Sequence, residues 1–136
     1  QMESITIKCP ITIKAKVTEN LKKQLTNELQ DNLKKTDLEL QQIDFHAKRV
    51  MAEQAKQDAQ GLVAIRQQVE MEKQKRLDLK NHLLEKLKET SDLEIGSEIV
   101  QGTFERIVEL KVGDELPQIM NSEVLLEDGK ILAFRN

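Results

Sequence analysis

The segment that most constrains this chain is ITIKCPITIKAKV, which runs from Ile5 to Val17. Every odd position is apolar, and every even position is Thr, Lys or Pro. Such alternation predicts a strand with one apolar face and one polar face. A single strand cannot bury its apolar face, and no strand pattern follows until about residue 93. The partner strands are therefore expected in the C-terminal part of the chain.

Residues 18–92 have the pattern of long, charged helices. Apolar or small side chains recur at alternating steps of four and three, which is typical of a coiled-coil seam. In the first half these positions are Leu29, Leu33, Thr36, Leu40, Ile43, Ala47 and Val50. The repeat loses its phase at QDAQG and restarts in the second half at Leu62, Ile65 and Val69, with Leu79 and Leu83 further on. Glu72 and Arg76 occupy seam positions between them.

The phase break predicts a turn near residues 58–61, because Asp favours turns and Gly can end a helix with a positive φ angle. The two helices would cover about 19–57 and 61–90. The alternative is one continuous helix with a skip in its repeat. An antiparallel hairpin returns the chain to its starting point, whereas a continuous helix would hold the first strand about 100 Å from the tail.

The tail carries strand and turn signals. The clearest is LLEDGKIL, which predicts a hairpin with a type I′ turn at Asp128–Gly129. In that hairpin two cross-strand pairs are expected, Leu126 with Ile131 and Val124 with Ala133.

These patterns predict an α+β fold. A long antiparallel two-helix coiled-coil hairpin, residues 18–92, is inserted into a small β module formed by residues 1–17 and 93–136. That module is expected to be a small β-barrel or a bent antiparallel sheet. Its core is marginal at this size, so it should depend on the N-terminal strand.

Composition excludes several protein classes. One third of the residues are charged and the formal net charge is −3. The single cysteine, Cys9, rules out an internal disulfide and is expected to be a small buried hydrophobe. No apolar run approaches the roughly 18 residues that a membrane span needs. We therefore expect a cytoplasmic protein that does not enter a membrane.

The sequence shows no pattern of a catalytic or metal site. The two histidines, His46 and His82, stand alone on the predicted helices. There is no glycine-rich phosphate loop, zinc-protease motif, cysteine pair or calcium loop. We expect a protein that is not an enzyme, with no catalytic residues, no cofactor and no bound metal.

The order of these elements, together with GSEIVQGTFERIVELKVGDEL and the final LLEDGKILAFRN, resembles the YlqD family of small bacterial proteins. The resemblance covers nearly the whole chain and is most specific between Gly96 and Leu116. It implies the architecture described above and a cytoplasmic bacterial setting. No activity is established for the family, so the resemblance assigns no functional residue.

The shape favours a scaffold, adaptor or chaperone-like assembly protein that acts through protein–protein contacts of the helical stalk and the β module. Apolar side chains off the main seam form a candidate surface for a homodimer or a protein partner: Leu38, Phe45, Leu77 and Leu84. Burying each would contribute roughly 1.5–3 kcal/mol. The alternative interpretation is a broad stripe that faces the hairpin's own core.

The alternative function is an RNA- or ribosome-associated factor. Five lysines at the first strand and the stalk base could contact phosphates: Lys8, Lys14, Lys16, Lys22 and Lys23. No aromatic side chain stands among them for base stacking. The segment after Asp92 has four basic and nine acidic residues, which also disfavours a polyanion partner.

Overall fold

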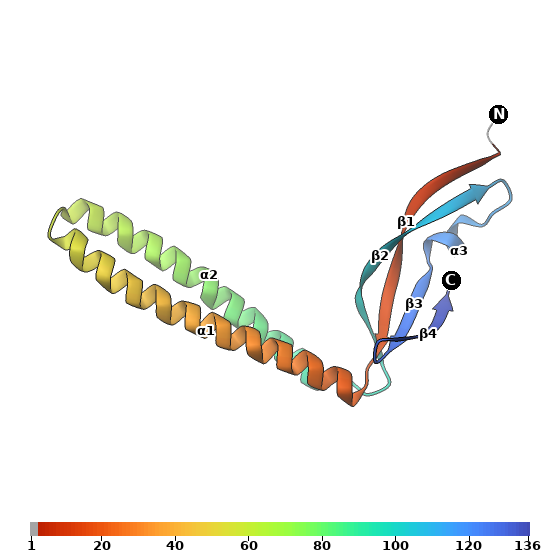
Figure 1. The fold of residues 1–136 in the computed structure, drawn as a ribbon, viewed down its shortest axis with the longest axis horizontal. Helices are drawn as coiled ribbons and strands as arrows, with labels where there is room; N and C mark the ends of the chain where they lie inside the picture. Colours follow the sequence, from red (N-terminus) through yellow and green to blue (C-terminus); the bar gives the residue numbers. More distant parts are fainter. Residues whose placement is uncertain (1–2) are drawn as a thin grey trace. The chain divides into compact units, whose positions relative to one another are not determined.

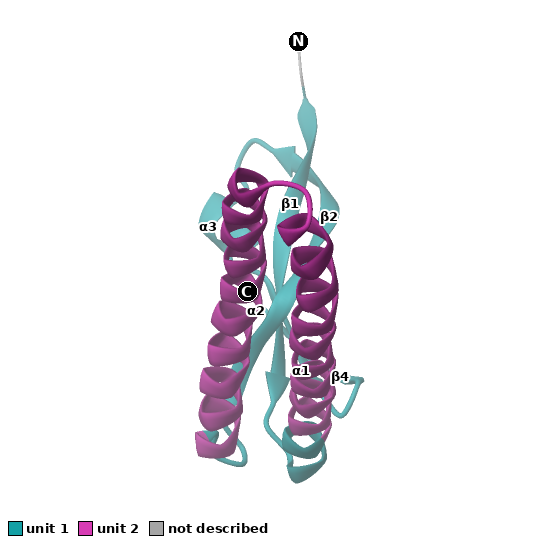
Figure 2. Ribbon diagram, turned by 90° about the vertical axis from the view of Figure 1, so that its left-hand side faces the viewer, with its two compact units in different colours: residues 1–23, 93–136 teal, residues 24–92 magenta. Residues whose placement is uncertain are grey.

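The computed structural model describes residues 3–136 and confirms the α+β class (Figure 1). The elements are β1 (Ser4–Lys16), α1 (Glu19–Ala55), α2 (Ala59–Asp92), β2 (Glu98–Lys111), α3 (Leu116–Met120), β3 (Glu123–Glu127) and β4 (Lys130–Arg135). Gln1 and Met2, which we expected in the β module, lie outside the described residues. The chain forms two compact units, residues 1–23 with 93–136 and residues 24–92 (Figure 2).

β1 lies inside a four-stranded sheet with the order β2-β1-β3-β4. It pairs antiparallel with β2 along its whole length, from Ser4 opposite Lys111 to Lys16 opposite Glu98. It also pairs with β3, over Thr12–Ala15. The expected pairing of the first strand with the tail is therefore confirmed.

Two details of the expected β module are wrong. The sheet is open rather than closed into a barrel, and it is mixed rather than antiparallel because β3 runs parallel to β1. The link through α3 reverses the chain after β2, so β3 runs in the same direction as β1. β3 and β4 have only five and six residues, and four strands are too few to enclose a packed interior.

The β3–β4 hairpin has the expected turn. Asp128 and Gly129 have φ angles of 49° and 81°, as a type I′ turn requires. Leu126 lies opposite Ile131, as expected, but Val124 lies opposite Phe134 instead of Ala133. The register shifts between Leu125 and Leu126, and this irregularity moves the expected pairing by one residue.

Cross-strand neighbours point to the same side of a sheet, so the pairing register defines what we term the apolar sheet face. It comprises Ile5, Ile7, Cys9, Ile11, Ile13 and Ala15 of β1, Ile99, Phe104, Val108 and Leu110 of β2, Val124 and Leu126 of β3, and Ile131 and Phe134 of β4. Its buried centre contains Cys9, Ile13, Ala15 and Val124. Cys9 is fully buried, as its place in the alternation predicts.

Thr18 connects the start of α1 to the β3–β4 hairpin. Its hydroxyl oxygen accepts a hydrogen bond from the Leu21 amide at 3.0 Å, which caps the helix. The same hydroxyl donates to Oδ1 of Asp128 at 2.6 Å. One side chain therefore satisfies the helix terminus and fixes the turn of a hairpin 110 residues away in sequence.

α1 and α2 form an antiparallel pair, as Figures 1 and 2 show. The first helix ends at Ala55 and the second begins at Ala59, so both boundaries at the turn lie two residues earlier than expected. Asp58 caps α2 by accepting hydrogen bonds from the amides of Gln60 and Gly61. Gly61 is helical and does not end a helix; a Cβ there would collide with the side chain of Gln54.

The central place of β1 gives a prediction about folding. A fragment of residues 93–136 lacks the strand that joins β2 to β3, so we expect it to show no cooperative thermal transition by circular dichroism. The intact chain is the control and should melt cooperatively. A cooperative transition in the fragment would show that the tail folds without β1.

Candidate interaction surfaces

One side of the hairpin seam is crossed by ion pairs. Nζ of Lys80 lies 2.8 Å from Oδ1 of Asp37, and Nζ of Lys73 lies 2.7 Å from Oδ1 of Asp44. Each of these four residues directly follows a seam position, so all of them flank the same side of the seam. The two helices are therefore bridged along this side.

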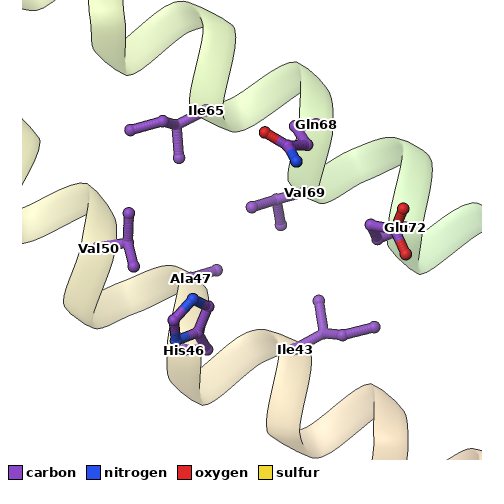
Figure 3. A pocket seen from close by; sticks show the side chains of 8 residues that line it. All are labelled: Ile43, His46, Ala47, Val50, Ile65, Gln68, Val69 and Glu72. Carbon is purple, nitrogen blue, oxygen red and sulfur yellow. The ribbon is translucent and has the colours of Figure 1, made fainter.

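The other side of the seam opens into an apolar hollow near the turn (Figure 3). Side chains of α1 and α2 point toward one another across a cavity of about 200 Å³. It is lined by Ile43, His46, Ala47, Val50, Ile65, Gln68, Val69 and Glu72. His46 and Gln68 directly precede seam positions, which places them on the side opposite the ion pairs.

A second hollow lies further along the same side. It has a volume of about 270 Å³ and is lined by Asn32, Lys35, Thr36, Glu39, Leu79 and Leu83. Asn32 and Glu39 also directly precede seam positions, Leu33 and Leu40. We refer to the two hollows together as the seam groove. It is defined by the residues that line the first hollow and by those that line the second.

A charged cluster separates the two hollows. Nη1 of Arg76 donates to Oε2 of Glu72 at 2.5 Å, and its Nε lies 3.5 Å from Oε2 of Glu39 on the other helix. The hydrogen bond from Arg76, helped by the charge of Lys75, holds the pKa of Glu72 below its usual value. Glu72 and Arg76 thus form ion pairs at two seam positions where a regular coiled coil would pack apolar side chains.

The four apolar residues proposed from sequence as an interaction surface are all exposed: Leu38, Phe45, Leu77 and Leu84. Leu38 and Phe45 lie midway between successive seam positions and so point away from α2. Leu77 and Leu84 each follow a seam position and lie on the side of the ion pairs. Their heptad positions therefore place the two stripes on different faces of their helices.

The lysines proposed for RNA contact are partly engaged within the protein. The pairing register places three of them on the polar face of β1, as expected: Lys8, Lys14 and Lys16. Nζ of Lys14 lies 2.7 Å from Oε1 of Glu123. Nζ of Lys22 donates to the carbonyl oxygen of Leu93 at 2.8 Å, while Lys23 is exposed. Two of the five lysines are therefore already bound within the protein, Lys14 by a carboxylate and Lys22 by a backbone carbonyl group.

Arg135 extends the charged network across the polar face. Its guanidinium donates to both carboxylate oxygens of Glu98 and lies 3.3 Å from Glu123. The bond from Arg135 lowers the pKa of Glu98, and that carboxylate raises the pKa of Arg135. Their strands are the two edges of the sheet, about 14 Å apart if it were flat. The contact therefore requires a strong twist and gives this face mixed charge.

Sequence reasoning missed two surfaces, and only one of them has a recognisable signal in the sequence. Residues directly before seam positions, such as His46 and Gln68, border the groove and could have been identified from the heptad repeat. Phe104 and Phe134 on the apolar sheet face could not, because their shared face depends on pairings through β1 and β3.

Within residues 3–136 no cluster of three His, Cys, Asp or Glu side chains is arranged to hold a metal ion. Neither long helix in that range has an apolar stretch that could cross a membrane.

The fold defines a class of α+β protein in which a helical hairpin lies in sequence between the first two strands of a small mixed sheet. The family model described as "YlqD protein" matches residues 5–135, so the chain belongs to the YlqD family. The structure is similar to the crystal structure of a protein of unknown function from Synechococcus sp. WH 8102, with a TM-score of 0.84 and 28% sequence identity. That match covers 98% of this chain and 95% of the other. No curated protein matches the chain.

The Glu72–Arg76 pair predicts a pH-dependent contribution to hairpin stability. Because the pKa of Glu72 is lowered in the folded state, its contribution is complete above its unfolded pKa and is lost as pH falls through the folded pKa. We expect E72Q to melt at a slightly lower temperature than the unmodified protein at pH 7 in low salt. The difference between the two melting temperatures should shrink as the pH falls below the ordinary Glu pKa of about 4.3. It should vanish once the pH lies below the folded pKa of Glu72.

Glu85→Gln is the control for this measurement. It removes the same charge from an exposed position of α2 and should leave the melting temperature at pH 7 nearly unchanged. A difference between E72Q and the unmodified protein that does not shrink at all as the pH falls below about 4 would show that the carboxylate charge is not its cause.

Proposed function

We propose that this YlqD-family protein is a non-enzymatic scaffold or assembly factor that acts through protein–protein contacts of its helical hairpin. The observation that carries the proposal is the seam groove, two hollows on one side of a hairpin whose other side is bridged by ion pairs. The first hollow is lined mainly by apolar side chains, and the second by Leu79 and Leu83 together with polar side chains. The proposal assigns no catalytic residue, cofactor or metal. The bacterial cytoplasm is the setting that the family resemblance implies.

The partner that fits the groove best is an amphipathic helix. Helices bind grooves through apolar side chains spaced by whole turns, and the groove offers two hollows in line. The residues of α1 that line the hollows are centred about eleven positions apart, which corresponds to roughly 16 Å along a helix. A partner helix with apolar residues about three turns apart could place one in each hollow and leave its polar residues beside the Glu39–Arg76–Glu72 cluster.

RNA or ribosome binding is the weaker candidate. In its favour, Lys8, Lys14 and Lys16 do share one face of β1. Against it, Glu123 pairs with Lys14, and Glu98 lies near enough to Lys14 and Lys16 for both charges to lower its pKa. A surface that binds phosphates gains affinity from unpaired positive charge, and these carboxylates reduce it.

The groove proposal predicts the effect of a bulky side chain at its rim. Gln68→Trp places an indole over the first hollow, and we expect at least a tenfold loss of the partner captured from lysate. Gln67→Trp is the matched control, because Gln67 is exposed and does not line the hollow; it should capture the partner normally. Equal capture by both variants would contradict binding in the groove.

The RNA alternative predicts retention on RNA or ribosomes that falls steeply with rising salt and is lost in a K14E/K16E double variant. We expect no such retention even at low salt. Lys34→Glu with Lys48→Glu makes the same charge change on α1 and serves as the control. Salt-sensitive binding that K14E/K16E abolishes and the control retains would favour the RNA function over the scaffold.

A further inference from the structure

We propose that the apolar sheet face is the interface through which two copies of this chain associate. This goes beyond the groove proposal, because it concerns the other compact unit and a different partner. The face defined above draws residues from all four strands. It is separate from the off-seam stripes of the helices.

Large side chains on this face are strongly exposed. The fractions are 69% for Phe104, 74% for Phe134, 62% for Ile131 and 50% for Ile5. Phe104 lies opposite Ile11, and Phe134 lies opposite Val124, which lies beside Ile13. Two of the chain's three phenylalanines are therefore brought to one face from opposite edges of the sheet.

The one charged residue that the register places on this face does not interrupt it. Arg106 lies opposite Cys9, and its Nη2 donates to the Ile119 carbonyl and to Oγ of Ser122, both at 2.8 Å. Its Nε is buried without a hydrogen-bond partner. The guanidinium is thus held against α3 rather than in solvent. Leu116 and Met120 of α3 are themselves about half exposed and add to the apolar surface.

The exposed area is what a stable dimer needs. The two phenylalanine rings alone offer about 300 Å², given the 150–250 Å² that an aromatic side chain can bury. With the exposed and half-exposed aliphatic residues, the face offers on the order of 700 Å² per copy, against about 800 Å² per partner in a standard interface. The largest apolar patch of a typical monomer is about 300–600 Å².

A second copy is the occupant that the charge distribution favours. In an isologous two-fold contact the same residues meet from both sides. On this face such contacts are apolar against apolar, with no repulsion between like charges. Apart from Arg106, the ionic residues of the sheet lie on the opposite face, among them Lys14, Glu123 and Arg135. A second copy of the chain is also present wherever the first is made, so it is available to cover an apolar face that would otherwise stay exposed.

Sedimentation equilibrium of the intact chain tests the proposal. We expect the unmodified protein to be dimeric at about 100 μM. F104Q/F134Q should weaken association at least tenfold while circular dichroism shows an unchanged helix content. Phe45→Gln is the matched control, since Phe45 is a 72% exposed phenylalanine on the outer face of α1. It should leave the dimer intact.

A protein that stays monomeric at about 100 μM, or a folded F104Q/F134Q variant that still dimerises like the unmodified chain, would overturn the proposal. So would loss of the dimer in Phe45→Gln alone, which would assign association to the helices. If the double variant does not fold, Phe134→Gln on the edge strand β4 should still weaken the dimer several-fold. The melting temperature of the unmodified protein should also rise with its concentration.

Discussion

The two ladders of β1 hold the sheet together. β2 and the β3–β4 hairpin do not pair with each other, and each is paired with β1 on one of its sides. Residues 18–92, most of them helical, separate β1 from the tail, and closing a flexible loop of about 75 residues would cost about 4 kcal/mol. The helical hairpin reduces this cost. Backbone bonds from Val17 to Ser97 at 2.7 Å and from Gly96 to Val17 at 2.8 Å then fix the two ends side by side.

The two sides of the hairpin seam differ in how the helices contact each other. Ion pairs bridge one side, while the other keeps a mainly apolar hollow and a more polar one with a charged cluster between them. Polar residues in a seam reduce stability and restrict which helices can pair. Here Arg76 pairs with Glu72 within α2 and also with Glu39 on α1. The hairpin therefore stays together without filling its seam, and the first hollow keeps apolar side chains in contact with solvent. This is the surface that the proposed partner helix would bind.

The alternation of polar and apolar residues in β1 gives the sheet one charged face and one apolar face. Its even positions meet Glu123, Glu98 and Arg135 in a mixed-charge network that links edge to edge. Its odd positions build a face with almost no charge, and α3 shields the single arginine there. A small sheet with one apolar face needs a second layer to cover it. Within residues 3–136 the five-residue α3 packs on β1, and Phe104, Phe134 and Ile131 of that face stay exposed. The dimer proposed above would supply the rest of the second layer.

The sequence by itself determined the elements and their exposed faces. Alternation identified β1, the four–three repeat identified the seam, where Thr36 and Ala47 are indeed buried, and the Asp128–Gly129 pair identified a tight turn. These features follow from local periodicity and from backbone angles that few residues adopt. Only the tertiary structure decided the strand order, the parallel pairing of β3, the register shift that sets Phe134 opposite Val124, and which flank of the seam stays open. Periodicity specifies which side of an element is apolar, but the neighbour that covers that side is chosen by the packing of segments far apart in the chain.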